Sequence, residues 1–152
     1  MTKILLARHG HVDGIRPERF RGRQPLALTA LGRAEAEALA RRIAGSWKPA
    51  HIYTSPMERS LKTAEAIARA CKLAGGEACD DLNDIDYGAW QFMTFEQAKT
   101  DDPALFAAWF ATPHLVRFPG GESLQDLVAR AAEALRLVCE RHPAPAETVV
   151  LV

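Results

Sequence analysis

The chain has 152 residues, of which 48% are hydrophobic and 25% are charged, a composition that excludes a disordered or fibrous protein. Its length suits one globular domain with a core of its own. The 19 basic and 19 acidic residues cancel, so no overall field favours a nucleic acid or an anionic membrane surface as partner. Any charged ligand must therefore be bound by a local group of side chains.

Cysteine spacing and the length of apolar runs indicate where the protein works. The three cysteines, Cys71, Cys79 and Cys139, are odd in number and lack Cys-x-x-Cys spacing, which argues against a disulfide framework or a zinc site. No apolar run approaches the roughly 20 residues of a membrane span, and no signal-peptide pattern opens the chain. We therefore expect a cytoplasmic protein with no targeting segment and no membrane or nucleic-acid partner. The oligomeric state is left open, a homodimer included.

Strands and helices are predicted to alternate along the first half of the chain. The apolar run 4–7 predicts a strand that is buried on both faces of a parallel sheet. Thr29 is the predicted N-cap of a helix that ends at Gly45. A second strand is predicted at 51–54, and the helix after it is predicted to begin with a capping box at Ser55.

The second half is predicted to hold a third strand, a cap and a long helix. The third strand is expected at 79–82. Eight of the eleven aromatic residues lie in the segment 87–118, on two short predicted helices that would form a small cap over the main sheet. A long helix with a capping-box-like start at Ser123 is expected to face the core through Leu124, Leu127, Val128, Ala131, Leu135 and Val138. With a last strand at 148–152, the pattern predicts an α/β three-layer sandwich with a mostly parallel central sheet.

Charged residues gather directly after the predicted strands, where α/β proteins bind ligands. Arg8 and His9 set a permanent cation beside an imidazole, and Gly10 allows a close backbone approach. Arg59 would lie in the first turn of a helix, where the macrodipole disfavours a cation by about 0.3–1 kcal/mol and a bound anion would remove the conflict. A strand end that reaches water and an exposed arginine are the alternatives.

The loop 8–23 is rich in arginine and holds only two acidic residues, Asp13 and Glu18. Several guanidinium groups near a helix N-terminus make a phosphate or carboxylate site. A solvated basic loop is the alternative explanation for the same residues.

Five segments, in chain order, resemble the histidine phosphatase superfamily, also called phosphoglycerate mutase-like. They are Arg8-His9-Gly10, Leu28-Thr29-x-Leu31-Gly32, Thr54-Ser55-Pro56-x-x-Arg59-x-x-x-Thr63-Ala64, Gly88-x-Trp90 and Pro119-Gly120-Gly121-Glu122-Ser123. The resemblance extends over essentially the whole chain. The short stretch of about 29 residues between Trp90 and Gly120 resembles the compact phosphatase branch, including the α-ribazole phosphate phosphatases, more than the glycolytic mutases.

The resemblance implies a phosphomonoester phosphatase that acts on a small phosphorylated metabolite through a phosphohistidine at His9. Arg8, Arg59 and Arg21 would bind the phosphoryl oxygens, and no metal or other cofactor would be needed. Asp84 would protonate the leaving alkoxide, at a position where the family more often has glutamate. Because other carboxylates crowd Asp84 in the sequence, a plain loop aspartate is the alternative.

Departures from the family pattern limit these expectations. Ile15 replaces an asparagine that often contacts phosphate, and the second catalytic histidine would follow the strand at 148–152. We expect residues 1–152 to be a single domain of a longer protein, cut before that histidine, so that residues 1–152 alone would be slow or inactive. A natural fragment with a damaged site is the other interpretation. A phosphoglycerate mutase-type phosphotransferase and a non-catalytic anion-binding or regulatory module remain alternative functions.

Overall fold

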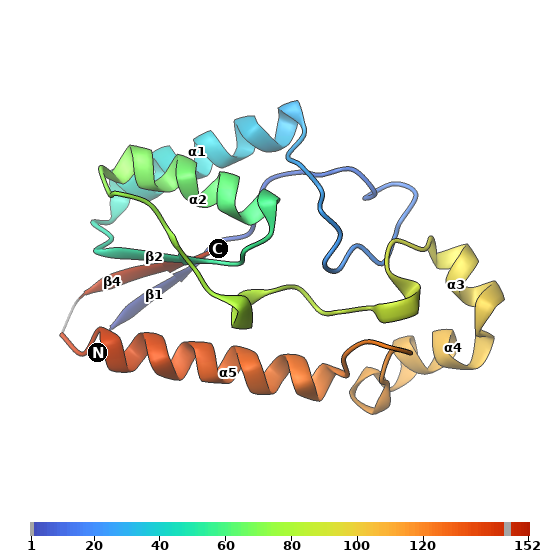
Figure 1. Ribbon diagram of the computed structural model, residues 1–152. Helices are drawn as coiled ribbons and strands as arrows, with labels where there is room; N and C mark the ends of the chain where they lie inside the picture. The colour runs from blue at the N-terminus through green and yellow to red at the C-terminus, as the bar shows by residue number, and fades with distance from the viewer. Residues whose placement is uncertain (1, 145–146) are drawn as a thin grey trace. The chain divides into compact units, whose positions relative to one another are not determined.

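A computed structural model describes residues 2–144 and 147–152 (Figure 1). Within these ranges, no helix is long and apolar enough to cross a membrane. The chain divides into two compact units. Unit 1 comprises Met1–Asp13, Pro25–Asn83 and Glu133–Val152, and unit 2 comprises Gly14–Gln24 and Asp84–Ala132.

Unit 1 is built around a parallel four-stranded sheet with the strand order β1-β4-β2-β3. All three strand pairings are parallel, and β4 lies between β1 and β2. The helices and strands of the unit are β1 (Lys3–Leu6), α1 (Ala30–Ser46), β2 (His51–Thr54), α2 (Glu58–Cys71), β3 (Glu77–Ala78), the second half of α5 (Leu124–Arg141) and β4 (Thr148–Leu151).

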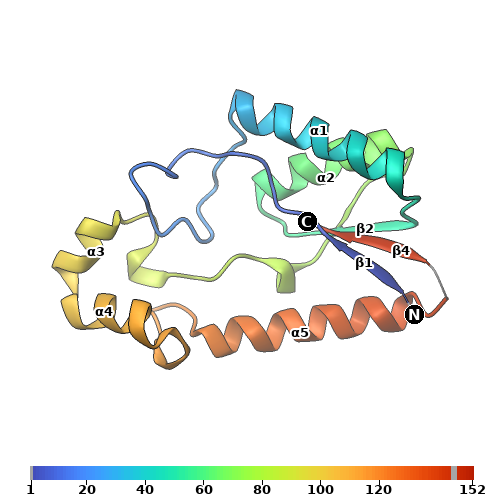
Figure 2. The ribbon, with the colours of Figure 1, turned by 180° about the vertical axis from the view of Figure 1, so that it is seen from behind.

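Helices cover both faces of this sheet. Neighbouring residues of a strand point to opposite faces, and both faces carry apolar side chains that must be buried. Val150 of β4 and Ile52 of β2 share one buried cluster with residues of α1 and α2. The adjacent residues Val149 and Tyr53 belong to a second cluster that contains Val138 of α5. Figures 1 and 2 accordingly show α1 and α2 on one side of the sheet and the unit 1 part of α5 on the other. The predicted α/β sandwich with a parallel sheet is confirmed.

Unit 2 is a group of short helices around a core of aromatic rings. Trp90 and Phe118 are fully buried, and the Phe20 ring lies 5.2 Å from that of Trp90. Offset contacts of this kind add to the free energy gained by burying large rings. The helices are α3 (Phe95–Asp101), α4 (Pro103–Ala111), the first half of α5 and 3-10 turns at Gly88–Trp90 and Pro113–Leu115. The two predicted short helices of this segment are confirmed.

The predicted capping box at the start of the long helix is also confirmed. The Asp126 backbone N–H donates to Ser123 Oγ at 3.2 Å, and the Ser123 N–H donates to Asp126 Oδ2 at 2.8 Å. These reciprocal bonds satisfy two backbone donors that the first turn of a helix would otherwise leave without partners.

Two strand predictions are wrong in detail. β1 pairs only with β4 and lies at the sheet edge, so the run 4–7 is not buried on both faces, and Leu6 is 80% exposed. The third strand is limited to Glu77–Ala78. The predicted strand 79–82 is instead mostly a 3-10 turn at Asp80–Leu82, because the Leu82 N–H bonds back to the Cys79 carbonyl.

The core-facing side of α5 is partly mispredicted. Val128 is 61% exposed and Leu135 is 39% exposed, whereas Ala134 and Val138 are buried. Consecutive helical residues are rotated by about 100°. The side of α5 that faces the core therefore contains Leu127 and Ala134, which directly precede the exposed Val128 and Leu135. Leu127 packs against the aromatic core of unit 2.

Two glycines allow the loop after β1 to touch the first turn of α1. A Cβ atom on Gly32 would lie 2.0 Å from the His11 carbonyl oxygen, and one on Gly10 would lie 2.1 Å from the Gly32 carbonyl oxygen. Both distances are far below van der Waals contact, and both clashes are with backbone. Gly45, in the last turn of the same helix, has open space where its side chain would be.

We expect Gly32→Ala to lower the free energy of unfolding by about 2 kcal/mol or more, because the backbone must shift to accept the methyl group. Gly45→Ala is the matched control and should raise stability by about 0.5–1 kcal/mol, since alanine is favoured over glycine in a helix. Urea denaturation measures both changes. A Gly32→Ala protein as stable as the wild type would contradict the close approach.

Candidate active site

The loop after β1 and the first turn of α2 bring His9 and Arg59 together. Arg59 Nε lies 3.2 Å from His9 Nε2, and Arg59 is only 2% exposed. His9 is half-buried. Both residues follow parallel strands, whose carboxyl ends lie at the same edge of the sheet. A buried permanent cation therefore faces an imidazole at the edge where α/β proteins bind their ligands.

The hydrogen bonds of His9 define which ring nitrogen carries the proton. Nδ1 lies 2.7 Å from the Gly10 carbonyl oxygen, which can only accept, so Nδ1 is the donor. Arg59 Nε always bears its hydrogen, so Nε2 must accept from it. The neutral ring thus has its lone pair on Nε2, directed toward the guanidinium group. That arrangement suits a nitrogen nucleophile that attacks an anionic group held by the arginine.

Thr63 joins the two segments that carry these residues. Its hydroxyl accepts from the Gly10 N–H at 3.3 Å and donates to the Arg59 carbonyl at 2.8 Å, and the residue is completely buried. Sequence reasoning included Thr63 in a motif but assigned it no role. The sequence feature that could have identified Thr63 is its spacing of four residues from Arg59, which places both residues on one face of a helix.

Two substitutions of Thr63 test this link, because one removes the hydroxyl group and the other removes the methyl group. Thr63→Val keeps the volume and removes the hydroxyl, which leaves the buried Gly10 N–H without its acceptor and should cost about 1–3 kcal/mol. Thr63→Ser keeps the hydroxyl and loses one methyl group, about 0.8 kcal/mol. The valine variant is therefore expected to be the less stable of the two in urea unfolding. The reverse order would show that packing of the methyl group contributes more to stability at this position than the hydrogen bonds of the hydroxyl group.

The predicted capping box at Ser55 is wrong. α2 begins at Glu58 with Met57 as N-cap, and no side chain caps it. Ser55 Oγ instead donates to Asn83 Oδ1 at 3.2 Å and accepts from the Met57 N–H at 3.3 Å. The hydroxyl therefore ties the end of β2 to Asn83. The carboxylate of Glu58 in the first turn offsets the unfavourable position of the neighbouring Arg59.

Arg8 and His11 flank the histidine but differ in their surroundings. The Arg8 side chain is exposed and forms no hydrogen bond or ion pair with the described part of the chain. His11 is fixed to the start of α1, since its Nδ1 lies 3.0 Å from Thr29 Oγ1 and its N–H donates to Glu35 at 2.7 Å. Thr29 is the N-cap of α1, as predicted. His11 thus helps to hold the loop to this helix.

Arg21, another predicted site residue, belongs to unit 2. It is half-buried and lines a cavity of about 270 Å³ together with Tyr87 and Trp109. Burial and, to a smaller extent, the negative charge of Asp84 raise the pKa of Tyr87 to about 12, although Arg21 acts in the opposite direction. Tyr87 therefore remains a hydrogen-bond donor at neutral pH.

Asp84 also belongs to unit 2, and its backbone carbonyl is held from two sides. Arg23 Nε donates to this oxygen at 3.2 Å and Arg130 Nη2 at 3.0 Å. The Glu122 carboxylate accepts from both arginines, at 2.8 Å from Arg23 Nη2 and 3.0 Å from Arg130 Nε. Sequence reasoning quoted Glu122 within a motif but missed this group of residues, because its members come from distant segments of the chain.

The surroundings of Glu122 favour its ionised form. Burial by itself raises the pKa of this carboxyl, but the hydrogen bonds from Arg130 and from the Asp86 N–H outweigh it, and the pKa is lowered from the ordinary value of 4.5. The stabilisation from Glu122 is therefore complete above about pH 4.5 and is lost as the pH falls through the lower folded value.

We expect Glu122→Gln to lower the free energy of unfolding at pH 7 by about 1–3 kcal/mol, since two guanidinium groups lose a charged acceptor. Below about pH 4.5 the gap between variant and wild type should narrow, because Glu122 in the wild type then becomes neutral too. Denaturation midpoints over this pH range measure the gap. Glu96→Gln, which removes a carboxylate outside this group, is the control. A gap independent of pH would contradict the assignment.

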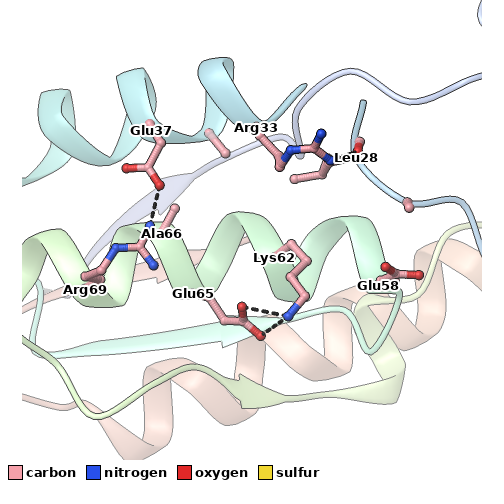
Figure 3. Close-up of a pocket in the computed structure, with 10 residues that line it drawn as sticks. Leu28, Arg33, Glu37, Glu58, Lys62, Glu65, Ala66 and Arg69 are labelled. Atoms are coloured by element: carbon pink, nitrogen blue, oxygen red, sulfur yellow. Dashed lines mark hydrogen bonds and ion pairs between the residues drawn. The ribbon is translucent and has the colours of Figure 1, made fainter. Parts of the chain in front are cut away.

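A groove of about 290 Å³ lies between α1 and α2 (Figure 3). Four of its charged side chains form ion pairs: Lys62 Nζ lies 2.9 Å from Glu65 Oε2, and Arg69 pairs with Glu37. These charges neutralise each other locally, so the groove offers a phosphate no buried cation comparable to Arg59. Among the described residues, no group of three or more His, Cys, Asp or Glu side chains is placed to hold a metal ion.

Comparison with known proteins assigns the chain to a family. It matches the histidine phosphatase superfamily (branch 1) over residues 4–152 and belongs to it, so the family predicted from the sequence is confirmed. Phosphoserine phosphatase 1 of Hydrogenobacter thermophilus is 34% identical over 142 residues, which cover 93% of this chain and 66% of that protein.

Solved structures of similar proteins share the fold. YhfR of Bacillus stearothermophilus has a TM-score of 0.91 at 32% identity and covers 100% of this chain and 73% of its own. A mycobacterial glucosyl-3-phosphoglycerate phosphatase has a TM-score of 0.85 at 29% identity, over 98% of this chain and 71% of its own. The chain spans 26% to 66% of the length of the curated relatives that it matches.

Proposed function

We propose that the protein hydrolyses phosphate monoesters of small metabolites through a phosphohistidine at His9. The observation that carries this proposal is the Nε2 lone pair of His9, directed at the buried Arg59 guanidinium 3.2 Å away. Phosphoryl transfer depends chiefly on positioning and charge neutralisation, which a neutral imidazole beside a fixed arginine provides. The names of the similar phosphoserine and glucosyl-3-phosphoglycerate phosphatases support a phosphorylated metabolite as substrate.

The reaction would proceed in two steps. First, His9 Nε2 attacks phosphorus while the bond from phosphorus to the leaving oxygen breaks, and the carboxylic acid of Asp84 gives its proton to that oxygen. In the second step, water attacks the phosphoryl group, the Asp84 carboxylate takes a proton from the water, and inorganic phosphate leaves His9. Arg8, Arg59 and Arg21 would neutralise the phosphoryl oxygens throughout.

We also propose a cytoplasmic location. Three free cysteines support a reducing compartment. No nucleic-acid or membrane partner is part of this proposal.

The phosphoenzyme is directly testable. Wild-type protein mixed with p-nitrophenyl phosphate and quenched in alkali should gain one phosphoryl group by intact mass, and brief acid treatment should remove it. A phosphorus–nitrogen bond to imidazole survives base and hydrolyses in acid, whereas a serine ester survives acid. His9→Ala should acquire no group, while Ser55→Ala, altered at the end of β2, should still be labelled.

An acid-stable group, or a group retained by His9→Ala, would contradict the nucleophile. Binding of inorganic phosphate by the wild type with no labelling would instead support an anion-binding module.

A further inference from the structure

We propose that Glu122, acting through Arg23 and Arg130, is a positioning residue for Asp84. The inference rests on the proposed function, in which Asp84 is the proton donor to the leaving group. None of the three residues is assigned contact with the reacting atoms. Their role is to fix the backbone from which the Asp84 carboxyl extends.

The carbonyl oxygen of Asp84 receives two charged donors. Arg23 Nε lies at 3.2 Å and Arg130 Nη2 at 3.0 Å. A carbonyl oxygen has two lone pairs, so both are engaged. Arg23 comes from the loop Gly14–Gln24 and Arg130 from α5, and the two guanidinium groups therefore clamp the segment from separate elements.

Glu122 holds this clamp together. Its Oε1 accepts from Arg23 Nη2 at 2.8 Å and from Arg130 Nε at 3.0 Å. Its Oε2 accepts from Arg130 Nη2 and from the Asp86 N–H, each at 3.0 Å. The side chains of Glu122 and Arg130 are only 19% and 14% exposed, so water screens their interaction weakly. Without the carboxylate, two guanidinium groups would repel each other at one carbonyl oxygen.

A further hydrogen bond restrains the Asp84 side chain. Asp84 is exposed, and its Oδ1 accepts from the N–H of the next residue, Ile85, at 2.9 Å. With the carbonyl and Oδ1 both bonded, the peptide group between Asp84 and Ile85 is fixed and the carboxyl has a defined direction. A proton donor must come within about 2.6–3.2 Å of the leaving oxygen, so an unrestrained loop carboxyl would transfer its proton less often.

Leaving-group dependence separates this role from a purely structural one. p-Nitrophenyl phosphate releases a weakly basic phenolate that needs no proton, whereas an alkyl phosphate releases a strongly basic alkoxide that does. The alkyl substrate is whichever of serine, glycerol and ethyl phosphate the full wild-type chain hydrolyses fastest. Asp84→Asn is the reference and should lower kcat/KM for the alkyl ester by about 10²–10⁴-fold, with a much smaller loss on the aryl ester.

Glu122→Gln and Arg130→Gln should show the same selectivity, with a loss of about tenfold or more on the alkyl ester. In combination with Asp84→Asn they should cause no further loss, because the group that they position is gone. Arg23→Gln, which removes one donor and spares the Glu122–Arg130 pair, should give a smaller selective loss. Arg117→Gln breaks the 2.7 Å ion pair with Asp126 elsewhere in unit 2 and should leave both activities unchanged.

Each other outcome counts against the proposal. Equal losses on both esters, or no loss, would show that Glu122 and Arg130 support the fold only. Additive losses with Asp84→Asn would show that they act independently of Asp84. An Asp84→Asn protein without leaving-group selectivity would remove the proton donor and this inference, while the phosphatase itself would stand. A wild type that hydrolyses neither ester would overturn the proposed function.

Discussion

The proton on His9 Nδ1 is the constraint on which the rest of the site depends. Because the Nδ1–H donates to the Gly10 carbonyl oxygen, Nε2 carries no hydrogen, and its lone pair can accept a hydrogen bond from Arg59 Nε. The hydrogen bond joins residues adjacent in sequence, so it requires a particular shape of the loop after β1. That shape is held by Thr63 on one side and by the contact between Gly10 and Gly32 on the other. The folding of α1 and α2 against the sheet thus decides the chemical state of one imidazole.

Local patterns in the sequence predict the structure well where no distant residue competes. Ser123 forms its capping box as expected, because its hydroxyl and Asp126 find each other within one turn. Ser55 stands in the same pattern, yet its hydroxyl donates to Asn83, far away in the sequence. Likewise, most of the apolar run 4–7 does lie in a strand, Lys3–Leu6, but the place of this strand at the sheet edge depends on which strands pair with it. A sequence pattern contains no information about such distant partners.

The same distinction applies to the site. His9 and Arg59 were predictable neighbours because both follow parallel strands of one sheet. Glu122 was not predictable as a centre of charge, since its partners Arg23 and Arg130 lie in an irregular loop and a long helix. From the sequence alone, an arginine in a loop is expected to be solvated. Only the tertiary structure shows that Arg23 shares the Glu122 carboxylate with Arg130. Arg21 was selected as part of an arginine-rich loop and Asp84 by family resemblance, and the roles of both in the reaction remain predictions.

The contact between Gly10 and Gly32 limits how the protein can be changed by evolution or in the laboratory. Each glycine is required by the backbone of the other segment, so a side chain at one position cannot be accommodated by a smaller residue at the other. A combinatorial library aimed at new activity can vary Gly45 and much of the outer face of α1, but it should keep these two glycines. A side chain at either position would displace the loop after β1, and the His9 imidazole would lose its orientation.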